Sequence, residues 1–349
     1  MLRPYPSTRM TRVAVIGGGA WGTALADLLA RKGEFDAVTL WAREPEVVDS
    51  VNRDHVNHMF LPDAPLAPGV TGQGDLAAAV RGADVVISAA PSHAVRAVMM
   101  RAGQGLGRGA GGTRPLVVSV SKGLDPESLS TPSCVLADVL PKDAPIAVLS
   151  GPSFAREVYA RQPTAVVAAA RDHAVAQRVQ QVFSTGFFRV YSATDVLGVE
   201  LAGALKNVIA LGAGILEGLG MGHNTRAALI TRGLAEITRL GVALGAEPAT
   251  FAGLAGMGDL ILTATGPQSR NHQLGVELGE GKRLEDALAG RAAVVEGVNT
   301  ARSAVTLGER HGVELPIARE VAEVLFNRKS AAQAVSDLME RELKPEHWR

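Results

Sequence analysis

Aromatic side chains and cysteine are scarce in this chain. Phe, Trp and Tyr together make up 4% of the 349 residues, and Cys134 is the single cysteine. One cysteine excludes an internal disulfide framework and indicates a reducing, cytoplasmic setting. Hydrophobic residues nevertheless reach 47%, so the core must be built mainly from Ala, Val, Leu and Ile.

An excess of charge of either sign is also absent. The sequence has 35 basic and 35 acidic residues, so its formal net charge is zero. This balance gives no general electrostatic reason to expect nucleic acid or a membrane surface as a partner. The most apolar runs are interrupted by glycine or charge, so we predict no membrane insertion. We also assign no metal site.

The first ten residues, MLRPYPSTRM, contain two prolines and two arginines but no apolar stretch. They therefore lack the hydrophobic segment that a signal peptide or membrane anchor requires. We treat residues 1–10 as a flexible N-terminal extension. The alternative, that translation starts at Met10, stays open.

Residues 11–194 alternate short Val-, Ile- and Ala-rich runs with helical patterns. Several runs are apolar throughout, which is typical of strands covered on both faces of a parallel sheet. The alternation predicts a doubly wound, Rossmann-like α/β domain. We expect its strands at Val13–Ile16, Ala37–Trp41, Asp84–Ala89, Leu116–Val120, Ile146–Leu149, Thr164–Ala168 and Phe188–Tyr191.

Residues 195–349 show long helical periodicities and no further convincing strand. With 349 residues the chain is long enough for a second core, since single cores stop growing near ~250–300 residues. We therefore predict an all-α C-terminal domain, its first helix capped by Thr194. The expected helices are Asp195–Leu216, Asn224–Leu244, Arg270–Leu278, Arg283–Ala289, Gly297–Arg310 and Ile317–Phe326.

A glycine-rich turn follows the first expected strand directly. Gly17, Gly19 and Gly22 form a G-x-G-x-x-G pattern between Val13–Ile16 and an amphipathic helical stretch. The first glycine permits a tight turn, the second lets the backbone approach a pyrophosphate, and the third lets the helix pack on the strand. In this context the pattern predicts a dinucleotide site rather than an ordinary glycine-rich turn.

Arg43 stands near the end of the second expected strand, in the segment Trp41-Ala42-Arg43-Glu44. An acidic residue at this place would bind the ribose 2′-hydroxyl of NAD, whereas an arginine suits the 2′-phosphate of NADP. Arg43 therefore favours NADP(H) and leaves NAD(H) open. The alternative is an ordinary surface arginine.

Small and polar residues follow several later strands. Ser121-Lys122-Gly123 and Ser150-Gly151-Pro152-Ser153 each come directly after an apolar run. The carboxyl ends of parallel strands meet at one edge of the sheet, where ligands bind. Lys122 is thus expected to face the ligand crevice. His93 also follows a strand, but the sequence leaves its role open.

Lys206 is the only ionisable residue in the run LAGALKNVIALGAGIL, and Asn207 is the only other strongly polar one. Burial of an ammonium is costly unless it is paired, and it lowers the lysine pKa toward neutral. A helix would place Glu200, Gly203 and the pair at 206–207 on one stripe. Lys206 is then either an acid/base group or a lysine that extends from a buried helix to water.

The helical half supplies partners for such a lysine. Asp259 follows two glycines in AGMGD and is the natural counter-charge for Lys206, with Thr263 four residues later. Arg270 can bind a phosphate through two parallel hydrogen bonds, and Ser269 can cap a helix that starts there. The alternative, if no cleft is present, is that Arg270 is a solvated surface charge and Asp259 an ordinary turn residue.

The sequence closely resembles bacterial NAD(P)-dependent glycerol-3-phosphate dehydrogenases. The segments GGGAWGTALA, VSKGLDPES, LSGPSFAREV, ELAGALKNVIALGAGILEGLG, FAGLAGMGDLILTATG, SRN and VVEGVNTA carry the resemblance. They span residues from about 11 to 326. The resemblance implies an N-terminal Rossmann-like domain followed by a helical domain of the 6-phosphogluconate-dehydrogenase-like type. It also implies reversible hydride transfer between dihydroxyacetone phosphate and sn-glycerol 3-phosphate, for phospholipid synthesis, in a homodimer.

The resemblance further implies roles for individual residues. Lys206 would be the acid/base residue, with Lys122 and Asp259 beside it. Around the substrate it implies Lys122, Gly151, Ser153, Lys206, Asp259, Ser269, Arg270 and Asn271, and the sequence pattern adds Asn207 and Thr263. At the cofactor it implies Ala20, Trp21, Arg43, Lys122, Ala155, Arg270, Val294 and Glu296, and the glycine pattern adds Gly17, Gly19 and Gly22.

Two other functions stay open at this point. A 3-hydroxyacyl or ketopantoate-type dehydrogenase would share the glycine pattern and the helical half, but it would not require a phosphate on the substrate. A non-catalytic nucleotide sensor would need no buried acid/base lysine. Lys206 together with Lys122 argues against the sensor.

Overall fold

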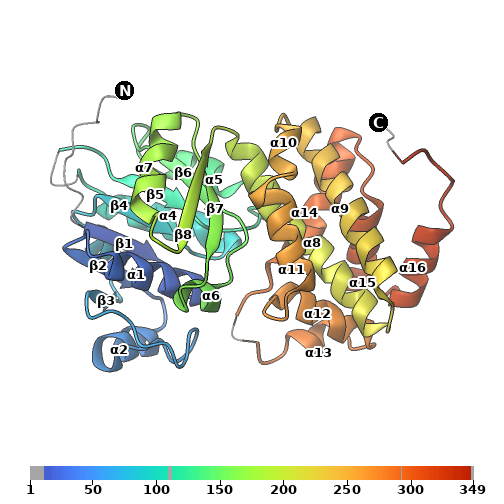
Figure 1. Cartoon of the computed structure of the whole chain (residues 1–349), viewed down its shortest axis with the longest axis horizontal. Coiled ribbons are helices and arrows are strands. Elements are labelled where there is room, and N and C mark those ends of the chain that lie inside the picture. Colours follow the sequence, from blue (N-terminus) through green and yellow to red (C-terminus); the bar gives the residue numbers. More distant parts are fainter. Residues whose placement is uncertain (1–11, 109–111, 292, 347–349) are drawn as a thin grey trace.

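The computed structural model describes residues 12–108, 112–291 and 293–346. Figure 1 shows two halves, a sheet flanked by helices and a bundle of helices. The expected extension at residues 1–10 lies outside the described residues, as does Met10. The last strand ends at Ala193 and the first long helix begins at Val196, so the change from sheet to helices falls where the sequence pattern changes.

The first half is an eight-stranded sheet in the order β3-β2-β1-β4-β5-β6-β7-β8. Crossovers run outward in both directions from β1 and β4, as in a doubly wound fold. The strands are β1 (Arg12–Ile16), β2 (Ala37–Trp41), β3 (Val70–Gln73), β4 (Val85–Ser88), β5 (Leu116–Ser119), β6 (Ile146–Ser150), β7 (Thr164–Ala169) and β8 (Phe188–Ala193).

Helices cover both faces of this sheet. Alternate residues of the strands point to opposite faces, so Val13 and Val15 pack with α1 and α7 while Ala14 and Ile16 pack with α3 and α4. The helices of this half are α1 (Ala20–Lys32), α2 (Pro45–Asp54), α3 (Leu76–Val80), α4 (Val95–Gly105), α5 (Pro132–Val139), α6 (Ala155–Tyr159) and α7 (His173–Phe183), with a 3₁₀ turn, η1 (Ser92–Ala94), before α4.

Two features of the sheet differ from expectation. β3 was not expected, because its sequence Val-Thr-Gly-Gln is half polar; Gly72 within it packs against the backbone of Val48. β7 runs antiparallel to β6, with Leu149 opposite Ala168, although the other pairings are parallel. The expectation of a wholly parallel sheet is therefore wrong at this one pairing.

The second half is a set of helices around α8 (Val196–Gly218), which is buried along most of its length. Asp195 caps α8 by accepting a hydrogen bond from the Gly198 N–H at 2.9 Å, so the cap is Asp195 and not Thr194. The other helices are α9 (His223–Ala243), α10 (Pro248–Phe251), α11 (Asp259–Thr265), α12 (Arg270–Gly279), α13 (Leu284–Leu288), α14 (Glu296–His311), α15 (Pro316–Phe326) and α16 (Ala331–Met339), with a π-helical turn at Leu254–Gly258.

Glycines bring α8 and α12 into backbone contact. A Cβ on Gly214 would overlap the carbonyl oxygen of His272 and lie 2.9 Å from Gly275 Cα. One turn later a Cβ on Gly218 would lie 2.9 Å from Gly279 Cα. Side chains larger than hydrogen do not fit between these helices, so the start of α12 is held rigidly beside the middle of α8.

α8 is long and apolar enough to cross a membrane by length and composition alone. Its most apolar 18-residue window is wholly buried by the surrounding helices, which is typical of the central helix of a globular core. Its apolar surface is thus accounted for by packing against residues such as Leu240, Leu274 and Ala304.

Candidate active site

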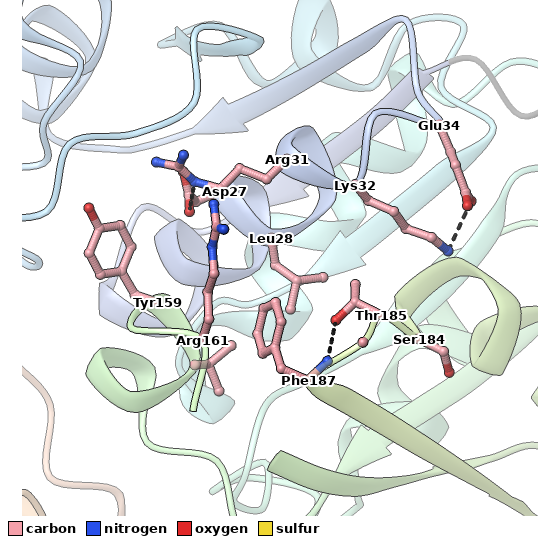
Figure 2. A pocket seen from close by; sticks show the side chains of 12 residues that line it. Asp27, Leu28, Arg31, Lys32, Glu34, Tyr159, Arg161, Ser184, Thr185 and Phe187 are labelled. Carbon is pink, nitrogen blue, oxygen red and sulfur yellow. Dashed lines mark hydrogen bonds and ion pairs between the residues drawn. The ribbon is translucent and has the colours of Figure 1, made fainter. Parts of the chain in front are cut away.

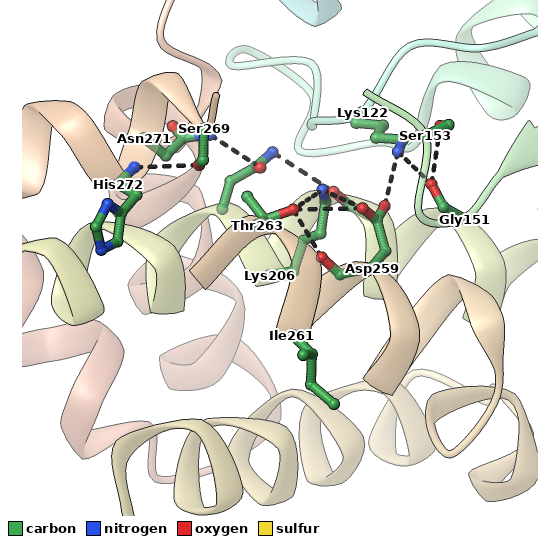
Figure 3. Close-up of polar contacts among 12 residues, drawn as sticks. Lys122, Gly151, Ser153, Lys206, Asp259, Ile261, Thr263, Ser269, Asn271 and His272 are labelled. Atoms are coloured by element: carbon green, nitrogen blue, oxygen red, sulfur yellow. Dashed lines mark hydrogen bonds and ion pairs between the residues drawn. The ribbon is translucent and has the colours of Figure 1, made fainter. Parts of the chain in front are cut away.

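Lys206 and Asp259 form a buried ion pair inside the helical half. Lys206 on α8 donates to Asp259 Oδ1 at 2.6 Å and to Thr263 Oγ1 at 2.5 Å (Figure 3). Lys206 and Asp259 are 5% and 1% exposed, so the pair is removed from bulk water. The expected counter-charge for Lys206 is therefore present, and the alternative of a lysine that extends to water is excluded.

A second lysine reaches the same carboxylate from the sheet. Lys122 follows β5 and donates to Asp259 Oδ2 at 2.7 Å and to the carbonyl oxygen of Gly151 at 2.9 Å. Ser153 Oγ donates to the same carbonyl at 2.9 Å. Asp259 thus joins residues that follow two neighbouring strands to the central helix of the other half (Figure 3).

The backbone around Lys206 and Asp259 explains how two lysines can approach one carboxylate. Gly203 lies one helical turn before Lys206, and a Cβ there would sit 2.9 Å from Ser150 Oγ and 3.7 Å from Lys122 Cγ. Gly256 in the π-helical turn packs directly on the backbone of Phe251. π-helical turns occur often at functional sites, and this one sets the start of α11 and hence Asp259.

The environment lowers the pKa of Lys206 to about 8. Burial is the largest cause, because removal from water disfavours the ammonium. Asp259 raises the pKa by its charge and its hydrogen bond, whereas the charge of Lys122 lowers it further. Lys206 can therefore hold or release a proton close to physiological pH.

A second group of polar residues lies beside this cluster, where α12 begins. Asn271 Nδ2 donates to Asn207 Oδ1 at 2.9 Å, and the Gly297 N–H donates to Asn271 Oδ1 at 2.8 Å. Ser269 caps α12 as expected, accepting the N–H of His272 at 3.2 Å. This chain of bonds fixes Asn207 next to Lys206.

Arg270, the first residue of α12, makes no hydrogen bond or ion pair within the described part of the chain. Its side chain is reached by solvent yet is surrounded by protein on most sides, so loss of hydration lowers the pKa of the guanidinium. The charge of Glu296 opposes this shift. A free, partly desolvated guanidinium is well suited to bind a phosphate.

The glycine-rich turn has the geometry that a dinucleotide requires. Gly17 has a φ of 134°, and a Cβ on Gly22 would overlap the Gly17 carbonyl, so both glycines are needed for the turn and its packing. Gly19 is different, because a Cβ there would meet no atom within 4 Å. Gly19 precedes α1, whose N-terminus has no side-chain cap, and Trp21 Nε1 is buried with no hydrogen-bond partner in the described residues. The cradle and its free donors fit an anionic cofactor.

Among the remaining expected cofactor residues, Ala155 packs in one apolar cluster with Ala20 and Trp21 at the start of α1. Arg43 follows β2 and is exposed, its guanidinium bound to Glu44 Oε1 at 2.7 Å. Ala155 begins α6, and Val294 is partly buried just before α14. His93, whose role the sequence left open, is exposed in η1.

Comparison with known proteins identifies the family. The model of the NAD-dependent glycerol-3-phosphate dehydrogenase N-terminus matches residues 12–176, and that of the C-terminus matches residues 195–336. The chain belongs to the NAD-dependent glycerol-3-phosphate dehydrogenase family. It is 53% identical over 339 residues to glycerol-3-phosphate dehydrogenase (NAD(P)+) of Geobacter sulfurreducens, which covers 97% of this chain and 99% of that relative. It is 50% identical over 337 residues to the enzyme of the same name from Myxococcus xanthus, with 96% and 98% covered.

Solved structures of this dehydrogenase family have the same fold. A glycerol-3-phosphate dehydrogenase from Coxiella burnetii superposes with a TM-score of 0.89 at 37% identity, covering 95% of this chain and 99% of that chain. A ketopantoate reductase from Ralstonia eutropha reaches a TM-score of 0.57 at 16% identity, with 95% and 100% covered, which shows a shared fold alone. The match at the level of sequence is thus with glycerol-3-phosphate dehydrogenases.

Two interactions in this protein were not expected from the sequence. Glu296 binds the turn after β4 through Ser92, and Glu200 binds the start of α5 through Ser133. Glu200 was expected on the stripe with Lys206, but its carboxylate faces Ser133 instead. Partners separated by 204 and 67 positions leave no local signal in the sequence.

A separate pocket of about 380 Å³, which neither Lys122 nor Lys206 lines, lies between the end of α1 and the turn before β8 (Figure 2). Its basic residues are largely engaged in structural bonds. Arg31 binds Asp27 at 2.7 Å, and Lys32 binds Glu34 at 2.9 Å and the carbonyl oxygen of Gln181 at 2.5 Å. Size alone therefore does not make this pocket the active site.

Proposed function

We propose that the protein catalyses the reversible, NAD(P)H-dependent reduction of dihydroxyacetone phosphate to sn-glycerol 3-phosphate. The observation that carries this proposal is the Lys206–Asp259–Lys122 cluster at the junction of sheet and helices, in a chain of this dehydrogenase family. We further propose that this reaction supplies sn-glycerol 3-phosphate for phospholipid synthesis.

Lys206 acts as the acid in the reduction. The reduced nicotinamide, when bound, supplies the hydride that adds to C2 of the substrate. As the C2–O double bond becomes a single bond, negative charge builds on the oxygen, and the Lys206 ammonium stabilises that charge and transfers its proton. In the oxidation, neutral Lys206 accepts the hydroxyl proton. A pKa of about 8 makes both forms accessible.

Asp259 and Lys122 keep Lys206 ready for this role. Asp259 accepts hydrogen bonds from both lysines, so it holds Lys206 Nζ in place while leaving a donor free for the substrate. Lys122 lowers the pKa of Lys206 and places a second positive charge near the developing alkoxide. The Gly151 carbonyl accepts from Lys122 and from Ser153 Oγ, and Thr263 Oγ1 accepts from Lys206, so these contacts help to fix the two ammonium groups.

The substrate phosphate binds where α12 begins. Arg270 brings an unpaired guanidinium, and the capped N-terminus of α12 adds a favourable helix dipole. Asn207 and Asn271, bound to each other, lie between this end and Lys206. Binding the phosphate, which does not itself react, orients C2 toward the nicotinamide, and this positioning contributes to the rate.

The cofactor would be held by the turn at Gly17–Gly22 and by Arg43 at the end of β2. Arg43 is exposed and, among the described residues, is paired only with its neighbour Glu44, so it is free to turn toward a 2′-phosphate. We therefore favour NADP(H) and leave NAD(H) as a second cofactor. Ala155, Val294 and Glu296 complete the surroundings of the crevice. We further propose a cytoplasmic homodimer.

The deciding experiment follows NADPH and NADH oxidation with dihydroxyacetone phosphate and, in parallel, with unphosphorylated dihydroxyacetone. We expect turnover with the phosphate ester only, and a lower KM for NADPH. Equal turnover of both substrates would instead indicate a dehydrogenase without a phosphate site. Cofactor binding without any turnover would indicate a nucleotide sensor.

A further inference from the structure

Ser92 makes an unusually complete contact with a carboxylate of the other half of the molecule. Its backbone N–H donates to Glu296 Oε1 at 2.9 Å, and its hydroxyl donates to Glu296 Oε2 at 2.5 Å. Ser92 is 2% exposed and begins η1, directly after the turn that follows β4. Both oxygens of Glu296 are therefore directed at one residue of the sheet domain.

The loop that carries Lys122 is packed on this contact. A Cβ on Gly123 would overlap Ser92 Oγ and would lie 2.9 Å from Glu296 Oε2. The Ser92 hydroxyl thus has little room to rotate away, and the carboxylate is confined between Ser92 and Gly123. This confinement fixes the direction of the Glu296 side chain.

Glu296 and Arg270 begin two helices whose next residues are hydrogen-bonded, because the Gly297 N–H donates to Asn271 Oδ1 at 2.8 Å, and the charge of Glu296 acts on the Arg270 guanidinium. A guanidinium has five donors and binds a nearby carboxylate readily through two parallel bonds. Yet Arg270 has no ion pair in the described residues, whereas Lys122 and Lys206 are both paired with Asp259. The Glu296 carboxylate is therefore bound by Ser92 and not paired with Arg270.

We propose that Ser92 is the positioning residue that keeps Glu296 and Arg270 apart. By binding both oxygens of Glu296, Ser92 keeps the carboxylate from pairing with Arg270, and Arg270 remains available for the substrate phosphate. The proposal rests on the proposed function only in that Arg270 binds this phosphate. Ser92 thus affects the affinity for phosphate, although Ser92 itself is expected to contact neither the substrate nor the cofactor.

The test compares variants that differ in whether residue 296 is charged and whether it is held. Ser92→Ala keeps the backbone bond but loses the hydroxyl, so we expect the KM for dihydroxyacetone phosphate at saturating NADPH to rise roughly tenfold, equivalent to about 1.4 kcal/mol. Competitive inhibition by inorganic phosphate should weaken by a similar factor. Glu296→Asp keeps the charge but is too short for the contact, and should act in the same direction.

Removal of the competing charge should restore phosphate binding. In the double variant with Ser92→Ala and Glu296→Gln, we expect the KM and the phosphate inhibition to match those of Glu296→Gln alone. Ser133→Ala is the matched control, because Ser133 donates its N–H and its hydroxyl to Glu200 at 2.8 Å and 2.5 Å in the same manner, whereas the carboxylate whose charge acts on Arg270 is Glu296. It should lower thermal stability without changing phosphate inhibition.

Two results would overturn the role of Ser92. One is unchanged phosphate inhibition in folded Ser92→Ala and Glu296→Asp. The other is an equal loss whether residue 296 is Glu or Gln, which would indicate a purely structural effect. Either result with a wild-type enzyme that turns over dihydroxyacetone phosphate rejects this inference alone, whereas an inactive wild type rejects the proposed function.

Discussion

Lys122 and Lys206 donate to different oxygens of the same carboxylate, one from the sheet and one from the central helix. Asp259 therefore holds two positive charges next to each other at the place where negative charge would develop on the substrate. The two neighbours act on the Lys206 ammonium in opposite directions, because the charge of Asp259 raises its pKa and the charge of Lys122 lowers it. This opposition can be measured.

The rate of each direction should depend on the protonation of Lys206. Its pKa is lowered to about 8, so reduction, which needs the ammonium, should decline as the pH rises above about 8. Oxidation needs the neutral amine and should increase with pH until it levels off above the same value. The pH profile of kcat/KM in both directions measures this. Profiles without an inflection near pH 8 would contradict the assignment.

Variants of the two neighbours should move that inflection in opposite directions. Asp259→Asn removes the group that raises the pKa of Lys206, so the inflection should shift to lower pH. Lys122→Met removes a positive charge that lowers this pKa, so the inflection should shift to higher pH. Both variants will be slower than wild type, but the direction of the shift is independent of the rate. Shifts in the same direction would disprove the electrostatic account.

Loss of the Lys206 ammonium should reduce turnover far more than cofactor binding. For Lys206→Ala we expect kcat to fall by roughly 10²–10⁴-fold, the usual contribution of a general acid. The Kd for NADPH, measured by fluorescence titration, should stay close to that of wild type. Lys282→Ala, an exposed lysine in the same half of the chain, is the control and should behave like wild type. Near-normal turnover in Lys206→Ala would remove this lysine from the mechanism.

Glu236 should make the stability of the helical half depend on pH. This buried carboxylate on α9 accepts the N–H groups of Ile317 and Ala318 at 2.8 Å and 3.3 Å, and burial raises its pKa to about 7. The folded state therefore retains a proton that the unfolded chain releases, so stability is highest below the unfolded pKa and is lost as the pH rises through 7.

Denaturant unfolding of wild type and Glu236→Gln at several pH values tests this. Between pH 5 and 8 wild type should lose roughly 1–3 kcal/mol relative to Glu236→Gln, which does not titrate. The same pH dependence in both proteins would show that Glu236 ionises with an ordinary pKa. The variant also loses one of the two bonds to α15, which lowers its stability at every pH and does not affect the comparison.

A methyl group between α8 and α12 should be poorly tolerated. In Gly275→Ala the new Cβ would overlap the Leu211 carbonyl and lie 2.9 Å from Gly214 Cα, and backbone atoms cannot rotate away. We expect a loss of roughly 1–3 kcal/mol in unfolding free energy, and a higher KM for dihydroxyacetone phosphate as Arg270 moves. Gly74→Ala meets no atom within 4 Å and should change neither quantity. Equal stability of the two variants would show that the helices can separate without cost.

The expected strands and long helices were found because their signals are local. An apolar run such as Val85-Val86-Ile87 needs only its own composition to indicate a buried strand. β3 was missed because its Val-Thr-Gly-Gln sequence is held by its neighbour β2 rather than by its own pattern. The orientation of β7 depends on how the chain returns after β6, which composition does not encode.

In the candidate site, too, contacts with a local sequence signal were predicted and contacts without one were not. The pairing of Lys206 with Asp259 was predicted because a charge within an aliphatic run needs a partner, and few carboxylates were available in a suitable segment. The contact of Ser92 with Glu296 could not be predicted, because both residues are ordinary surface types when considered alone. The hydrogen bonds between Ser92 and Glu296 form only when the sheet and the helical half pack together.

The glycine contact between α8 and α12 also has a consequence for the choice of substrate. Lys206 stands on one of these helices and Arg270 begins the other, and no flexible loop or long side chain separates the two backbones. The distance between the proposed sites for the reacting carbonyl and for the phosphate is therefore fixed by the packing of the two helices. A molecule with a carbonyl and a phosphate separated by one additional carbon could therefore reach Lys206 or Arg270, but not both.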